Sequence, residues 1–125
     1  MNDVFDRFPR FEIEAFRTFA ELDDAMRRET GKGCADDGSE YFCVTVSDEE
    51  FVAVKSFVLV SGFDAGSEDD VAMLAHEVSH AVDDFLRRIE EKNPGGEVRA
   101  YLVQAAMLTC LGQLNGPERA EGDGE

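Results

Sequence analysis

The stretch SEDDVAMLAHEVSHAVDDFLRRIEE, residues 67–91, decides the fold, because it predicts a long amphipathic helix. Ser67 suits the cap of such a helix, and the three acidic residues after it suit the positive end of the helix dipole. At 100° per residue, one stripe of this helix is entirely apolar. The stripe contains Val71, Leu74, Val78, Val82, Phe85 and Ile89. We therefore expect it to be buried and the opposite face to be exposed.

Two histidines lie on that opposite face, four residues apart. The side chains of His76 and His80 project from one ridge of the helix, one turn from each other. Two ring nitrogens at this spacing can reach one ion at about 2.0–2.1 Å, the distance that zinc requires. Glu77 is expected on the exposed flank beside them, where it can contact a water on the metal without being a ligand. This is the HExxH pattern, in which two histidines hold zinc and the glutamate is the general base.

The alternative is that both imidazoles are simply solvated, because short motifs also occur by accident. The chain has two histidines, and both fall within this pattern. The pattern also lies on a helix whose other face is cleanly apolar. Both observations favour a metal site.

A catalytic zinc commonly has three protein ligands and one open position. Because the chain has no third histidine, the third ligand must be a carboxylate, and we choose Glu97. The turn at residues 93–96, Asn-Pro-Gly-Gly, lets the next helix fold back antiparallel, with its first turn beside the histidine ridge. The alternative is that Glu97 only satisfies the helix dipole. Asp83, Asp84 and Glu90 are weaker candidates.

The rest of the chain predicts an α+β fold with an N-terminal helix, a small antiparallel sheet and two C-terminal helices. A capping box from Thr18 to Glu21 opens the first helix, and Gly31 to Gly33 end it. Residues 11–15 suit a short lead-in strand or an irregular start. Residues 41–46, 51–54 and 56–60 predict a sheet of about three strands, with a bulge near Lys55. The last helix is expected from Glu97 to about Leu114.

Composition narrows the class of partner. A formal net charge of −16 over 125 residues argues against nucleic acid and against anionic membrane surfaces. The chain has no apolar run near eighteen residues, and its N-terminus lacks the pattern of a secretory signal, so we expect a cytoplasmic protein. Cys34, Cys43 and Cys110 form no metal-binding spacing and are expected to be reduced.

Residues 75–82 and 96–102 together resemble the gluzincin branch of the zincin metallopeptidases. In particular, they resemble short phage- and prophage-encoded zincin-like proteins, over about residues 67–114. The resemblance implies zinc as cofactor and a zincin-like fold, so we expect one zincin-like metallopeptidase domain over residues 1–116. Residues 117–125 are short on apolar side chains and predict an acidic disordered tail. The resemblance also implies a small sheet against the active-site helix, whose edge strand can bind an extended peptide by strand addition.

The chain departs from larger gluzincins in two respects. It has no second large domain to form a deep substrate cleft, and it has no third histidine to stabilise an oxyanion. Tyr101, one turn after Glu97, is the remaining donor, although a core position suits it equally well.

These observations predict a zinc-dependent peptidase in which His76, His80 and Glu97 hold the metal. Glu77 takes the proton of the attacking water and passes it to the leaving amine. The alternative is a non-catalytic zinc-binding protein of phage assembly or host interaction. A third hypothesis is a peptidase that acts on one partner protein. The sequence leaves the substrate and the oligomeric state open.

Overall fold

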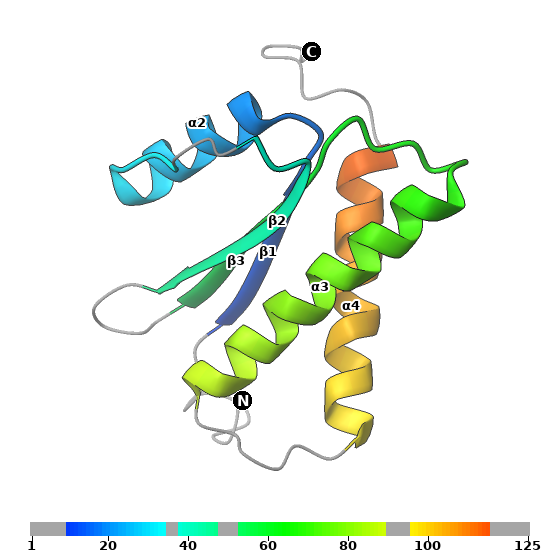
Figure 1. Ribbon diagram of the computed structural model, residues 1–125. Helices are drawn as coiled ribbons and strands as arrows, with labels where there is room; N and C mark the ends of the chain where they lie inside the picture. Colours follow the sequence, from blue (N-terminus) through cyan, green and yellow to red (C-terminus); the bar gives the residue numbers. More distant parts are fainter. Residues whose placement is uncertain (1–9, 35–37, 48–52, 90–95, 116–125) are drawn as a thin grey trace.

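The computed structural model describes residues 10–34, 38–47, 53–89 and 96–115, with only the backbone described at residues 96 and 97. The elements in chain order are β1 (Arg10–Phe16), α2 (Phe19–Thr30), β2 (Tyr41–Ser47), β3 (Ala53–Val60), α3 (Glu68–Arg88) and α4 (Gly96–Asn115). Helix α2 covers one face of the sheet, and α3 and α4 cover the other (Figure 1). This is an α+β fold, as predicted.

The sheet is mixed, with the strand order β1-β3-β2. Strand β3 pairs with β2 antiparallel and with β1 parallel. The predicted antiparallel sheet is wrong on two points: residues 53–60 form one strand that continues through Lys55, and β1 takes the third place. The cause is the central position of β3. Because Phe57 to Val60 are buried on both faces, they form a continuous apolar run without the alternation that marks a half-exposed strand.

Helix α2 has the predicted ends. Its N-cap is Thr18, whose hydroxyl accepts a hydrogen bond from the backbone N–H of Glu21 at 3.1 Å. Its C-cap is Gly31, with a φ of 80° that favours glycine. The two caps are local sequence features, and they fix the helix at residues 19–30.

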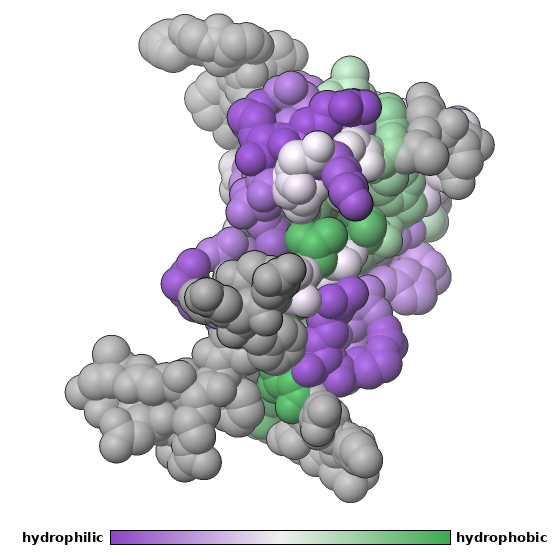
Figure 2. Space-filling view, turned by 90° about the vertical axis from the view of Figure 1, so that its left-hand side faces the viewer, coloured by the Kyte–Doolittle hydropathy of each residue, from purple (hydrophilic) through white to green (hydrophobic). Residues whose placement is uncertain are grey.

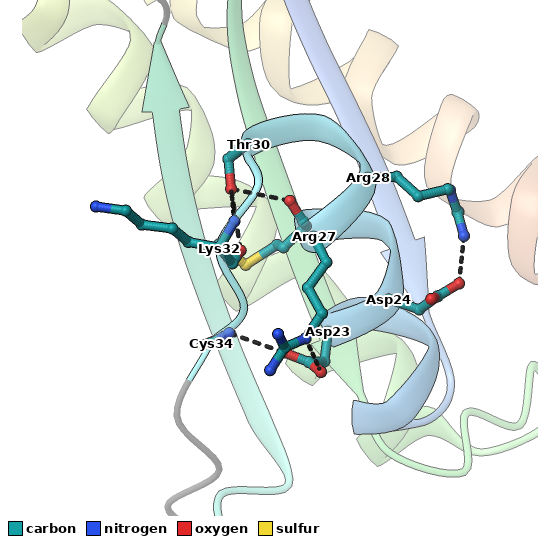
Figure 3. Close-up of polar contacts among 8 residues, drawn as sticks. Asp23, Asp24, Arg27, Arg28, Thr30, Lys32 and Cys34 are labelled. Atoms are coloured by element: carbon teal, nitrogen blue, oxygen red, sulfur yellow. Dashed lines mark hydrogen bonds and ion pairs between the residues drawn. The ribbon is translucent and has the colours of Figure 1, made fainter.

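The segment after α2 folds back along the helix (Figure 3). The carboxylate of Asp23 accepts hydrogen bonds from the backbone N–H of Cys34 at 2.8 Å and from Arg27 at 2.9 Å. A Cβ atom on Gly33 would collide with both of these side chains. A larger residue would force the flexible ends of Asp23 and Arg27 to shift, so glycine here allows the close approach of this segment to α2, a role beyond that of a helix end.

The core has two parts, one on each face of the sheet. Alternate residues of β3 contribute to each part. Val54, Val58 and Val60 pack toward α3 and α4, whereas Phe57 and Leu59 pack toward α2. The α3 and α4 side is the larger of the two, and it is the side that positions the histidines.

The two C-terminal helices lie close to their predicted limits. Ser67 caps α3 and accepts a hydrogen bond from the backbone N–H of Asp70 at 3.2 Å. Helix α3 ends at Arg88, about three residues before the predicted end. The predicted tail at residues 117–125 lies outside the described residues. Within the described part of the chain, no helix is long and apolar enough to cross a membrane.

The two edges of the sheet differ. The outer edge of β1 is covered by the side-chain amide of Gln113 from α4. Its Oε1 accepts from the backbone N–H of Ala15 at 2.7 Å, and its Nε2 donates to the carbonyl of Ile13 at 3.2 Å. Among the described residues, no strand lies beyond β2. The sheet is therefore closed by a side chain at one edge and ends in β2 at the other.

Candidate metal centre

Helix α3 holds both histidines on its exposed face. The opposite face of this helix is buried against the sheet and α4 through residues that include Leu74, Val78 and Val82. Because this burial fixes the rotation of the helix, His76 and His80 must point outward, and both are exposed. The predicted division of α3 into a buried stripe and a histidine ridge is confirmed, with Val71 and Ile89 only partly buried.

The two imidazoles are placed as one metal ion requires. The Nε2 atoms of His76 and His80 are 3.2 Å apart. At a zinc–nitrogen distance of about 2.05 Å, that separation gives an N–Zn–N angle of about 103°, close to tetrahedral. The ring planes are inclined by 89°, with centroids 4.7 Å apart. A hydrogen bond from the N–H of one ring to the bare nitrogen of the other also fits this separation. The distance therefore suits zinc but does not by itself demonstrate a metal.

Glu77 is buried, which corrects the expectation of an exposed flank. Only 6% of the residue is exposed. The physical reason is that α3 packs against β2 as well as against β3 and α4, so its buried face is wider than the predicted stripe. Burial raises the pKa of the Glu77 carboxyl, while the nearby His76 and His80 act in the opposite direction.

The third predicted ligand is only partly described. Glu97 falls in the first turn of α4, as expected, but its side chain lies outside the described residues. Arg99, two positions later, forms an ion pair with Asp83 at 2.9 Å. Because Asp83 is three residues after His80, this ion pair holds the beginning of α4 near the C-terminal side of the histidine ridge.

The weaker carboxylate candidates have other partners. Asp83 accepts two hydrogen bonds from Arg99, at 2.9 and 3.3 Å. Asp84 accepts from the hydroxyl of Thr45 at 3.1 Å and pairs with Arg87. Glu90 lies outside the described residues. Among residues with described side chains, no group of three or more His, Cys, Asp or Glu is arranged to hold a metal ion. The side chain of Glu97 is not among these residues.

Tyr101 is not a core residue, because 63% of it is exposed. It lies on the side of α4 opposite to Ala106 and Cys110, which are buried. The alternative of a buried tyrosine is wrong. Its role as an oxyanion donor stays a prediction, and this outward position gives it no support.

A polar network between α3 and β2 was not predicted from the sequence. Thr45 and Ser56 share a buried hydrogen bond of 2.7 Å, and Thr45 also donates to Asp84. Arg88 donates to the carbonyl of Thr45 and to the hydroxyl of Ser47, each at 3.0 Å. The sequence does show hydroxyl residues within two otherwise apolar strands. The partners of Thr45 and Ser47 on α3, however, lie about 40 residues away in the chain. The network fixes β2 alongside α3, next to Glu77.

Cys43 lies in the same region, on β2. Burial raises the pKa of its thiol to about 12, with Asp84 and Glu77 acting in the same direction. A thiol of that pKa is protonated at neutral pH and is unreactive. The three cysteines are free, which agrees with the expected reduced state.

The surface around α2 is separate from this centre. Seen from that side, the surface of the described residues carries large hydrophilic areas with hydrophobic areas between them (Figure 2). A cavity here is lined by Glu12, Glu29, Thr30, Val46, Ser47, Ala53 and Lys55, none of which belongs to α3 or α4. Lys55 pairs with Glu14 at 3.0 Å and with Glu29 at 3.6 Å. Among the charged lining residues, Lys55 and Glu29 thus pair with each other, and Glu12 pairs with Arg10 at 3.2 Å. None of these contacts involves the histidines.

Comparison with known proteins finds no match: no family model, no curated protein and no solved structure is similar to this chain. The geometry of the centre is therefore the basis for any functional conclusion.

Proposed function

We propose that this chain is a zinc-dependent peptidase in which His76, His80 and Glu97 bind the metal and Glu77 is the general base. The observation that carries the proposal is the 3.2 Å separation of the two Nε2 atoms, with a buried carboxyl on the next residue. Two imidazoles at that separation suit tetrahedral zinc, and a neighbouring carboxyl suits proton transfer to and from water.

A bound zinc ion would polarise the substrate carbonyl and lower the pKa of water at the site. The chain's own contribution is Glu77. Because burial raises its pKa, its carboxylate is a stronger base than an exposed glutamate. In the proposed reaction it accepts a proton from the attacking water, whose oxygen adds to the carbonyl carbon. It then gives that proton to the amine nitrogen as the C–N bond breaks.

Strand β2 supports an extended peptide as the substrate. It is the edge strand next to α3, and hydrogen bonds from Arg88 and to Asp84 hold it there. A peptide that paired with the outer edge of β2 would run beside the helix that carries Glu77. The opposite edge is covered by Gln113, which contacts two backbone groups of β1, whereas on β2 Arg88 contacts the carbonyl of Thr45.

Glu77→Gln tests the proposal. This variant should keep its zinc, while cleavage of a peptide library should fall by about 10²–10⁴-fold, the usual contribution of a general base. The matched control is Glu68→Gln, which changes an exposed glutamate in the first turn of the same helix. It should alter neither zinc content nor cleavage. Full cleavage by a zinc-loaded Glu77→Gln protein would remove Glu77 from the reaction.

A non-catalytic zinc-binding protein, acting in phage assembly or host interaction, is the second candidate. One observation favours it: Tyr101 points away from the inner face of α4. In that case the parent protein binds zinc but cleaves no peptide, and Glu77→Gln changes no biological readout. Parallel zinc and cleavage measurements on the parent protein separate the two candidates.

A further inference from the structure

The outer face of α4 carries a row of exposed residues without charge. Tyr101 and Leu108 are the large members, with 63% and 64% of their surface exposed. Ala105 and Gly112 are the small members, and both are exposed. We call these four residues the α4 seam. The opposite side of the helix is buried, so the seam faces away from the domain.

The α4 seam is complementary to itself. Along the helix it reads large, small, large, small, with steps of four, three and four residues. Read from Gly112 back to Tyr101, the spacings are again four, three and four residues, but the side chains now run small, large, small, large. When two such helices lie antiparallel, Tyr101 therefore faces Gly112 of the second copy, and Leu108 faces Ala105 of the second copy. Large side chains meet small ones at every position, as close packing of two helices requires.

Charge also favours a second copy of this chain. Residues 100–115 contain no charged side chain, although the whole chain has a formal net charge of −16. Two copies repel each other through most of their surfaces, and the α4 seam is where they can meet without opposing charges. A strongly basic partner would instead prefer the acidic surfaces. Residues 116–125 contain no large apolar side chain that could cover the seam.

Gly112 adds an independent observation. A Cβ atom placed on it meets no atom within 4 Å, so nothing inside the domain requires a glycine here. Glycine within a helix is unfavourable compared with alanine. A close approach by another molecule would give this position a reason to lack a side chain.

We propose that the α4 seam is the interface of a symmetric homodimer, in which the α4 helices of two copies pack antiparallel. The twofold axis passes beside residues 106 and 107, midway between Tyr101 and Gly112. The seam spans about 17 Å at 1.5 Å per residue, which is short for an interface. We therefore expect a dissociation constant in the micromolar range.

Sedimentation velocity from low to several hundred micromolar protein tests the proposal. The parent should change from monomer to dimer over this range, and Leu108→Glu should raise the dissociation constant by at least about tenfold. Ala20→Glu is the control, because it adds the same charge at an exposed position on α2. Added salt should strengthen the parent dimer, because it screens repulsion between two acidic chains. Weakening by salt would contradict this charge argument.

Gly112→Leu separates the interface from folding. Leucine should raise the thermal stability of the domain, since glycine is the poorer helix former and the space beside it is open. It should still weaken the dimer, because it fills the space that Tyr101 of the second copy needs. A parent that stays monomeric at every concentration overturns the proposal, including the case in which residues 1–9 cover the seam. A dimer unchanged by both Leu108→Glu and Gly112→Leu also overturns it.

Discussion

Helices α3 and α4 have nearly equal lengths, 21 and 20 residues, but they distribute their side chains in opposite ways. Helix α3 separates a buried apolar face from an exposed face with histidines and charged residues. Helix α4 is apolar on both sides, with Cys110 buried and Leu108 exposed. Under the two proposals above, the outer surface of α3 binds a metal ion, and the outer surface of α4 contacts a second copy of the chain.

The largest expected difference between the outer faces of α3 and α4 is in zinc affinity. His76→Ala should lower zinc affinity by at least about 100-fold, because a ligand contributes a direct bond. Glu97→Ala should also weaken zinc far more than Asp84→Ala or Glu90→Ala, whose charges act only through screened interactions. Zinc titration against a chromophoric chelator measures all four variants. Leu108→Glu on the outer face of α4 should retain full zinc affinity.

Two outcomes of that titration would contradict the proposed zinc site. Unchanged metal binding in His76→Ala would remove the histidine ridge as a zinc site. Equal affinities across the three acidic variants would place the third ligand somewhere other than Glu97.

The inner face of α4 should show an intermediate effect. Gln113→Ala removes two hydrogen bonds to the outer edge of β1. The free energy of unfolding should fall by about 1–3 kcal/mol, as expected when buried backbone groups lose partners. Urea denaturation measures it. The control is Gln104→Ala, the same substitution on the exposed side of α4, which should stay within about 0.5 kcal/mol of the parent. Equal losses in both variants would mean that the two faces of α4 contribute alike.

The smallest effect concerns the metal-free stability of Glu77→Gln. Because burial raises the pKa of Glu77 in the folded state, the folded protein binds this proton more tightly than the unfolded chain does. The stability of the parent therefore falls as pH rises from the ordinary glutamate pKa through the raised value. Glutamine lacks that loss, so the variant should melt a few degrees higher at neutral pH, and the gap should close in acid. A gap that widens in acid would mean that Glu77 is stabilised as a carboxylate.

Features set by neighbouring residues could be predicted from the sequence. The caps at Thr18, Gly31 and Ser67 depend on side chains within three or four positions, and so does the histidine ridge. The limits of α2 and the exposure of His76 and His80 follow from such local rules.

Features set by distant residues could not be predicted. The parallel pairing of β1 with β3 joins segments more than 40 residues apart, and the alternation that could have indicated it is absent from a strand buried on both faces. The burial of Glu77 was missed for a related reason: a helical wheel gives the direction of a side chain but not the number of elements that surround the helix. The third ligand depends on how α4 packs against α3, which the helix pattern does not contain.

The hydrogen bonds from Gln113 also have a consequence for the order in which the protein is made. They join residues 98 and 100 positions apart, so β1 leaves the ribosome well before Gln113 does, and its outer edge stays uncovered until those residues have followed. During that interval the nascent chain presents an unpaired strand edge to other chains. Ribosome-bound chains that stop before residue 113 should therefore associate with chaperones more strongly than chains extended past α4.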